Sequence, residues 1–124
     1  MIRAVIIDDE KLARDVIANY LGEFCPDVEI VAQASSVSTA LTAIQKTSPD
    51  LVFLDIEMPD GNGFDLLNLF ETIDFKIIFV TAYSDYAIRA FRFSALDYLL
   101  KPVKIDELVD AVARVRTAEP RGIS

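Results

Sequence analysis

Histidine and tryptophan are absent from the 124 residues of this sequence, and cysteine occurs once. Without histidine, the chain has no Ser-His-Asp or Cys-His catalytic unit, lacks the usual ligands of most zinc sites, and forms no phosphohistidine of its own. The single Cys25 has no partner for an internal disulfide, which agrees with a reducing cytoplasm as its location. Apolar runs are only strand-sized, so we expect neither a membrane span nor a secretory signal.

Basic residues are also scarce in the chain. Twelve Lys and Arg residues face twenty Asp and Glu residues, which gives a net charge of −8. Such a surface repels the phosphates of nucleic acids, so we do not expect this domain to bind DNA or RNA directly. Hydrophobic residues nevertheless make up 52% of the sequence, which is enough to bury the core of a single domain.

Short apolar runs alternate five times with stripes of helical periodicity. The expected strands are 3–7, 28–33, 51–54, 77–80 and 95–100, and the expected helices are 12–21, 37–44, 64–70 (or as far as 75), 86–93 and 105–115. We expect Gly22 to end the first helix, and Ala87, Ala90 and Phe91 to face inward from the fourth. Strands that are apolar throughout and joined by helices indicate an α/β fold, with a doubly wound parallel sheet covered on both faces.

Polar residues follow four of the five expected strands at the point where each strand ends. Asp8 and Asp9 follow the first strand and Asp55 the third, while Thr81 and Lys101 follow the fourth and fifth. The carboxyl ends of parallel strands meet at one edge of a sheet, so we expect these side chains to lie close together. Clustered carboxylates repel one another unless a cation neutralises them, and oxygen ligands without histidine or cysteine favour Mg²⁺. The lysine and the threonine would then bind the other oxygens of a phosphoryl group transferred to Asp55.

Each of these residues, taken alone, also has an ordinary structural explanation. An Asp-Asp pair after a strand often caps a helix, a single Asp or Thr often belongs to a turn, and a single Lys is most often a solvated charge. The Pro- and Gly-containing segment 55–63 is compatible with a plain strand-to-helix turn. The combination of suitable residues at four strand ends favours a functional site.

From Met1 to about Arg116 the sequence resembles the receiver domains of two-component response regulators. The motifs that carry the resemblance are Asp8-Asp9, Asp55 followed by Met58-Pro59 and Gly63, Thr81-Ala82, and Asp97-Tyr98 ahead of Lys101-Pro102. The resemblance implies a flavodoxin-like fold with strand order 2-1-3-4-5, a receiver domain over residues 1–117, and a tail or linker over 118–124. Segments 81–83, 86–87, 90–91 and 95–102 are most similar to receivers of the LytTR type (LytR/AlgR-like), which precede a DNA-binding domain.

The resemblance also implies roles for individual residues. Asp55 becomes the phosphoacceptor. The implied Mg²⁺ site has Asp9, Asp55 and the backbone carbonyl of Glu57 as ligands, and Asp8 mainly holds the metal's waters. The residues implied to respond to the phosphoryl group are Thr81, Tyr98 and Lys101, with a cis peptide bond at Pro102. Side chains at Glu57 and Tyr83 are expected to tune the lifetime of the phosphorylated state.

The resemblance implies a sensor histidine kinase as the partner, and the lack of histidine means that the phosphoryl donor must come from outside this chain. A small acyl phosphate is a second possible donor. Phosphorylation is expected to change the face formed by 86–93, 95–100 and 105–115, and to promote homodimerisation through it. The expected output is control of transcription by a DNA-binding domain that is not part of these 124 residues.

Other functions remain compatible with parts of the pattern. An aspartyl-phosphate phosphatase or phosphotransferase also uses Asp with Mg²⁺, but it usually has a second Asp two residues after the nucleophile, and position 57 is Glu. A degenerate receiver that only binds partners, and a receiver that acts alone, are further alternatives. A flavodoxin-like flavin protein is disfavoured because the acidic edge would repel the flavin phosphate.

Overall fold

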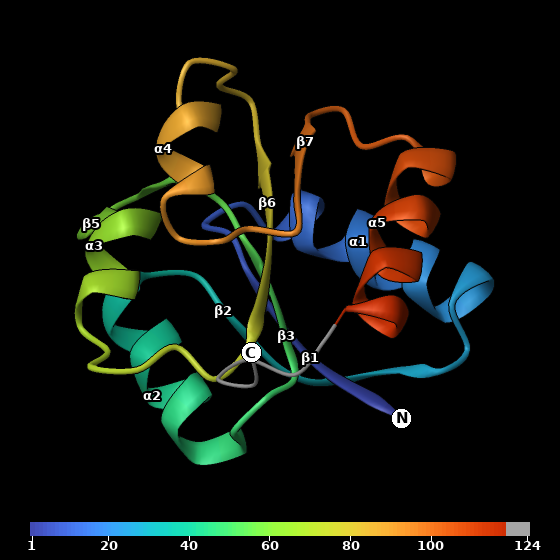
Figure 1. Ribbon diagram of the computed structural model, residues 1–124, viewed down its shortest axis with the longest axis horizontal. Helices are drawn as coiled ribbons and strands as arrows, with labels where there is room; N and C mark the ends of the chain where they lie inside the picture. Colours follow the sequence, from blue (N-terminus) through green and yellow to red (C-terminus); the bar gives the residue numbers. More distant parts are fainter. Residues whose placement is uncertain (119–124) are drawn as a thin grey trace.

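Five strands form one parallel sheet in a computed structural model that describes residues 1–118 (Figure 1). The strands are β1 (Ile2–Ile7), β2 (Val28–Ala34), β3 (Leu51–Leu54), β6 (Lys76–Thr81) and β7 (Asp97–Leu100). They lie side by side in the order β2-β1-β3-β6-β7, and every neighbouring pair is parallel. Numbered within this sheet alone, the order is the expected 2-1-3-4-5, so the predicted α/β fold is confirmed.

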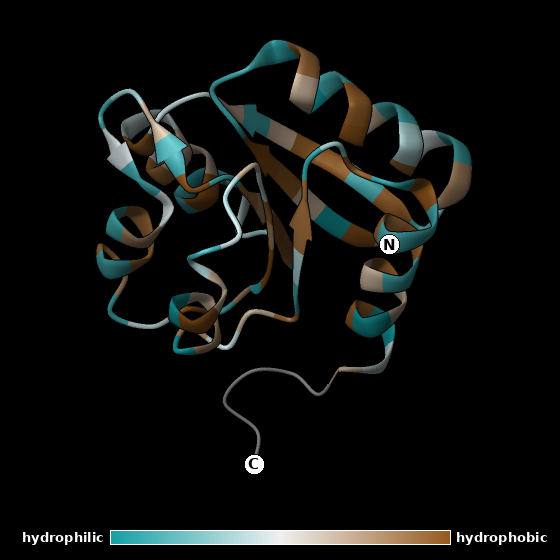
Figure 2. Cartoon of the chain, turned by 90° about the horizontal axis from the view of Figure 1, so that it is seen from above, coloured by the Kyte–Doolittle hydropathy of each residue, from teal (hydrophilic) through white to brown (hydrophobic). Residues whose placement is uncertain are grey.

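Helices cover both faces of the sheet (Figure 1). One face carries α1 (Lys11–Phe24) and α5 (Ile105–Thr117), and the other carries α2 (Val37–Thr47), α3 (Gly63–Asn68) and α4 (Ala87–Phe91). Successive strand residues point to opposite faces, so Val5 and Ile7 enter one core while Ala4 and Ile6 enter the other. This explains why the central strands are mostly apolar, as the brown stretches along the sheet in Figure 2 show.

The first helix is longer than expected. Instead of ending at Gly22, α1 continues to Phe24 and ends at Cys25. A glycine inside a helix costs about 1 kcal/mol relative to alanine, and burial of the flanking Leu21 and Cys25 outweighs that cost. Cys25 is a free thiol with no exposed surface, and its burial raises the pKa of the thiol.

The second helix ends before Ser48 and Pro49, as expected. Ser48 adopts a left-handed conformation (φ 46°), and its amide donates to the carbonyl of Ile44. Pro49 then follows at a position where its ring cannot continue a helix.

The fourth helix differs most from its prediction. It has five residues, and of these only Ala90 is buried. The expectation that Phe91 faces inward is wrong, because its side chain is 74% exposed. Phe93, two residues later, instead packs on the core with its ring centroid 5.5 Å from that of Phe64.

A small antiparallel ribbon, which the sequence pattern did not indicate, interrupts the connection between β3 and α3. Its strands are β4 (Glu57–Met58) and β5 (Gly61–Asn62). Over the part of the chain that the structure describes, no helix is long and apolar enough to cross a membrane. The expected tail at 118–124 lies, except for Ala118, outside the described residues.

Candidate functional site

The carboxyl ends of β1, β3, β6 and β7 bring the predicted site residues to one edge of the sheet. Ile7 pairs with Leu54 across β1 and β3, so Asp8 and Asp55 leave neighbouring strands at the same level. The Asp55 amide donates to the carbonyl of Ile7 at 3.0 Å. Backbone hydrogen bonding in the sheet therefore fixes the positions from which the two carboxylates project.

Lys101 directly follows β7, and its side chain contacts the carboxylates of the site. Its Nζ lies 2.9 Å from Asp55 Oδ2, 2.8 Å from Asp8 Oδ2 and 3.3 Å from Glu10 Oε1. The backbone amide of Lys101 donates to the carbonyl of Thr81, which fixes the loop that carries the lysine. Burial lowers the pKa of Lys101, but its interactions with the Asp8 and Asp55 carboxylates more than offset this effect, and the pKa lies above its ordinary value. The lysine is therefore a permanent positive charge in the site.

Asp8 is almost completely buried, at 1% exposure. Its Oδ1 accepts a hydrogen bond from the Glu10 amide at 2.9 Å. Its buried Oδ2 accepts no well-aligned hydrogen bond within residues 1–118, so its contact with Lys101 is chiefly electrostatic. Burial raises the pKa of Asp8, and the nearby Asp55 adds to this effect, while Lys101 and the Glu10 amide oppose it.

Carboxylate oxygens of Asp8, Asp9 and Glu10 can lie within 4.8 Å of one another. An under-satisfied buried oxygen beside other carboxylates, with no nitrogen or sulfur ligand, fits a hard divalent cation such as Mg²⁺. This acidic cluster therefore fits Mg²⁺.

A hollow of about 300 Å³ opens above Asp55. The residues that line it are Asp9, Glu10, Asp55, Glu57, Met58, Pro59, Ala82, Tyr83 and Lys101. The structure thus brings five of the predicted site residues together around one opening. At its mouth, a hydrogen bond to the Glu57 carboxylate raises the pKa of the Tyr83 phenol.

Thr81 and Tyr98 connect to the site through Tyr83. Thr81 is completely buried, and its Oγ1 accepts a hydrogen bond from the Tyr83 amide at 3.4 Å. The Tyr98 hydroxyl donates to the Tyr83 carbonyl, and the Tyr98 ring packs 6.0 Å from that of Phe79. Burial is the main cause that raises the pKa of Tyr98. The peptide bond between Lys101 and Pro102 is cis.

Two residues at the site were missed by sequence reasoning. Glu10 contacts Lys101 and lies in the acidic cluster, and its signal was its place as third acid in the run Asp8-Asp9-Glu10. Arg14, one turn into α1, donates from Nη1 to the Asp8 carbonyl at 2.6 Å. No sequence pattern singles out Arg14, because the contact depends on how the helix leaves the strand.

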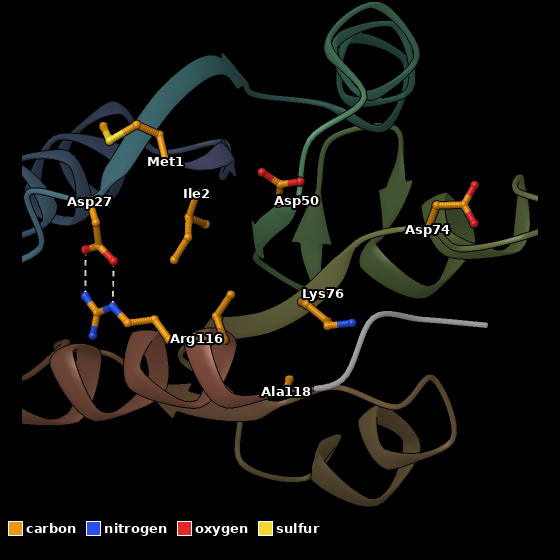
Figure 3. A pocket seen from close by; sticks show the side chains of 9 residues that line it. Met1, Ile2, Asp27, Asp50, Asp74, Lys76, Arg116 and Ala118 are labelled. Atoms are coloured by element: carbon orange, nitrogen blue, oxygen red, sulfur yellow. Dashed lines mark hydrogen bonds and ion pairs between the residues drawn. The ribbon is translucent and has the colours of Figure 1, made fainter. Parts of the chain in front are cut away.

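A second hollow, of about 550 Å³, lies at the opposite edge of the sheet (Figure 3). Asp50 and Lys76 line it from the starts of β3 and β6, and Arg116 reaches it from the end of α5. Arg116 makes two hydrogen bonds to Asp27, at 2.6 and 2.7 Å. The lining of this second hollow contains none of the predicted site residues.

The sequence profile of the response regulator receiver domain matches residues 4–113. The chain belongs to this family. Receiver domains of response regulators are signalling proteins rather than classical enzymes. Sensory transduction protein LytT of Bacillus anthracis is 41% identical to this receiver domain over 118 residues, which are 94% of this chain and 48% of that protein. Transcriptional regulatory protein BtsR of Escherichia coli is 40% identical over 117 residues, 94% of this chain and 48% of that protein.

Solved structures agree with the receiver fold. The response regulatory domain of protein mrkE from Klebsiella pneumoniae superposes with a TM-score of 0.84 at 27% identity, covering 93% of this chain and 95% of that one. The REC domain of the response regulator AraT from Geobacillus stearothermophilus gives 0.83 at 32% identity, covering 94% and 93%. This chain spans about half the length of the curated relatives that it matches.

Proposed function

We propose that this receiver domain accepts a phosphoryl group on Asp55 from a sensor histidine kinase in an Mg²⁺-dependent reaction. The observation that carries the proposal is the position of Lys101 Nζ, 2.9 Å from Asp55 and 2.8 Å from Asp8, beside a hollow open to a donor. Asp55 is 5% exposed, so its carboxylate is fixed within the protein and reached through that opening.

The chain's own residues carry most of the proposed chemistry. A carboxylate oxygen of Asp55 attacks phosphorus in line, the new O–P bond forms while the donor's N–P bond breaks, and the imidazole leaves. Lys101 then pairs with a phosphoryl oxygen, since phosphoryl transfer depends mainly on positioning and charge stabilisation. Mg²⁺ held by Asp8, Asp9, Asp55 and the Glu57 carbonyl would neutralise the remaining phosphoryl charge.

The proposed output begins at Thr81. Its hydroxyl, which accepts from the Tyr83 amide, turns toward the new phosphoryl group and thereby alters the loop that binds Tyr98. The altered loop leads into α4, and Tyr98 lies in β7. We propose that the face of α4, β7 and α5 then forms a homodimer, and that the output is transcription, as the name of BtsR suggests for that relative.

Mass spectrometry of the intact protein tests the phosphoacceptor. Incubation with a small phosphodonor and Mg²⁺ is expected to add the mass of one phosphoryl group to wild type and nothing to Asp55→Asn. Removal of Mg²⁺ with a chelator is expected to abolish the addition. Equal uptake by Asp55→Asn and wild type would show that Asp55 is not the acceptor.

The same reaction separates the main alternatives. Multiple turnover of an aryl phosphate by the wild-type protein would identify a phosphatase instead. A chain that binds neither Mg²⁺ nor a phosphoryl group would be a receiver that acts only through protein contacts.

A further inference from the structure

The loop that joins β3 to α3 is folded on itself from Asp55 to Gly63. The Gly63 amide donates to the Ile56 carbonyl at 2.7 Å, and β4 pairs with β5 between them. A Cβ at Gly63 would lie 2.8 Å from the Asp55 carbonyl, so the close return of the loop requires glycine. Residues 59 and 60 lie between β4 and β5 and form the tip of this ribbon.

Asp60, at the tip, connects the loop to a different element. Its Oδ1 accepts from the Val37 amide at 2.7 Å and its Oδ2 from the Ser38 amide at 3.1 Å. These amides belong to the first turn of α2, where backbone donors have no partner within the helix and favour a negative charge. The two hydrogen bonds hold the pKa of Asp60 below its ordinary value.

Helix α2 also has a cap of its own, which is separate from Asp60. The Ser36 hydroxyl accepts from the Thr39 amide, and the Thr39 hydroxyl accepts from the Ser36 amide. The ribbon lies close to the helix, because a Cβ at Gly61 (φ +148°) would be 3.3 Å from Val37 Cγ2. Since α2 is already capped and packs on the sheet through Val37, Ala40 and Ile44, the element that gains most from the bridge is the loop.

We propose that Asp60 is a positioning residue for the phosphorylation site. Its bridge to α2 holds the ribbon in place three residues after Glu57, which supplies a backbone carbonyl to the metal in the proposed function. The inference rests on that function. A ligand carried by a loop binds more tightly when the loop is ordered in advance, because less conformational entropy is lost on binding.

Asp60→Ala removes both hydrogen bonds and releases the tip of the ribbon. The dissociation constant for Mg²⁺, measured by calorimetry, is expected to rise on the order of tenfold, the usual effect of removing a group that orients a metal ligand. The phosphorylation rate at saturating Mg²⁺ is expected to stay close to that of wild type. Asp60→Asn keeps an acceptor oxygen and is expected to recover part of the affinity.

Ser36→Ala is the matched control, because it weakens the same end of α2 without releasing the loop. It is expected to lower the unfolding midpoint and to leave the Mg²⁺ dissociation constant unchanged. In metal-free protein, hydrogen exchange of the Asn62 amide is expected to accelerate in Asp60→Ala and not in Ser36→Ala. These two measurements separate a positioning role from a contribution to stability alone.

Equal Mg²⁺ affinity and equal exchange rates in Asp60→Ala and Ser36→Ala would overturn the inference about Asp60 while leaving the proposed function standing. Failure of the wild-type protein to bind Mg²⁺ and to take up a phosphoryl group would instead overturn the proposed function, and with it this inference.

Discussion

At the scale of single residues, the site is organised around one cation shared among several acids. Lys101 contacts Asp8, Asp55 and Glu10, yet its side chain is only 18% exposed. Partly buried carboxylates are stable as anions only where a positive charge lies close. In the metal-free protein, the charge of Lys101 therefore neutralises part of the negative charge that a bound divalent cation would neutralise.

Lys101→Ala is expected to lower the free energy of unfolding by on the order of 3 kcal/mol, because Asp8 and Asp55 lose their shared cation. The same change is expected to tighten Mg²⁺ binding and to slow phosphoryl transfer by about a hundredfold. Urea unfolding with and without Mg²⁺, together with calorimetry, measures these effects. Lys11→Ala, which breaks an exposed pair with Asp15, is the control, and identical behaviour of the two variants would contradict the prediction.

Glu57 and Tyr83 both line the hollow above Asp55, and their side chains interact there. Tyr83→Ala opens that hollow to water and is expected to shorten the lifetime of phosphorylated Asp55 several-fold. Tyr83→Phe keeps the ring and is expected to have a smaller effect. Loss of the phosphoryl mass with time measures both lifetimes, and an unchanged lifetime in Tyr83→Ala would exclude a shielding role.

At the scale of the secondary-structure elements, an ion pair fixes the end of α5. Arg116 and Asp27 join this helix to the turn after α1, as the dashed lines in Figure 3 show. The hydrogen bonds from Arg116 are the main cause that lowers the pKa of Asp27. Both side chains are about 40% exposed, so we expect the pair to contribute less than about 1 kcal/mol.

The pH dependence of this contribution follows from the lowered pKa of Asp27. The pair stabilises the fold above the ordinary carboxyl pKa of about 3.9, and its contribution is lost as the pH falls through the lowered value. Asp27→Asn is therefore expected to destabilise the protein at neutral pH and to converge with wild type in acid. Denaturant unfolding across pH checks this, with Glu23→Gln as an exposed control. A constant difference between Asp27→Asn and wild type at every pH would contradict the prediction.

The elements also show what sequence can and cannot predict. The strand 51–54 was located to the residue, because a buried strand must be apolar on both faces. By contrast, α4 has too few residues for a reliable helical period, and the two-residue strands β4 and β5 have no period at all. At the site, the positions of Asp55 and Lys101 directly after two expected strands predicted that their side chains lie close together. The contacts of Glu10, Arg14 and Asp60 depend on how separate elements pack and have no local signature.

At the scale of the whole molecule, α1 and α4 each carry large apolar side chains that are highly exposed. Leu12 on α1 is 79% exposed, and Ile88 and Phe91 on α4 are 76% and 74% exposed. Beside Phe91, a hollow of about 400 Å³ is lined by residues of α4, β7 and α5, including Ala90, Tyr98 and Arg114. This is the face on which the proposed homodimer would form.

Phe91→Ser is expected to prevent dimerisation that a phosphoryl mimic and Mg²⁺ promote in wild type, because it removes the largest exposed apolar group of that face. Leu12→Ser removes a similarly exposed side chain from α1 and is expected to leave the dimer intact. Sedimentation velocity over a range of concentrations distinguishes the outcomes. A wild-type protein that stays monomeric with the mimic, or a Phe91→Ser variant that still dimerises, would exclude this interface.

The burial of Cys25 gives the molecule an internal chemical probe. It is the one cysteine in the sequence, it has no exposed surface, and the pKa of its thiol is raised. An alkylating reagent reacts with thiolate, so it reaches Cys25 only when the end of α1 opens. The rate of alkylation therefore reports the free energy of that opening. A second cysteine placed on the surface would accept a fluorescent label selectively, without replacement of the native one.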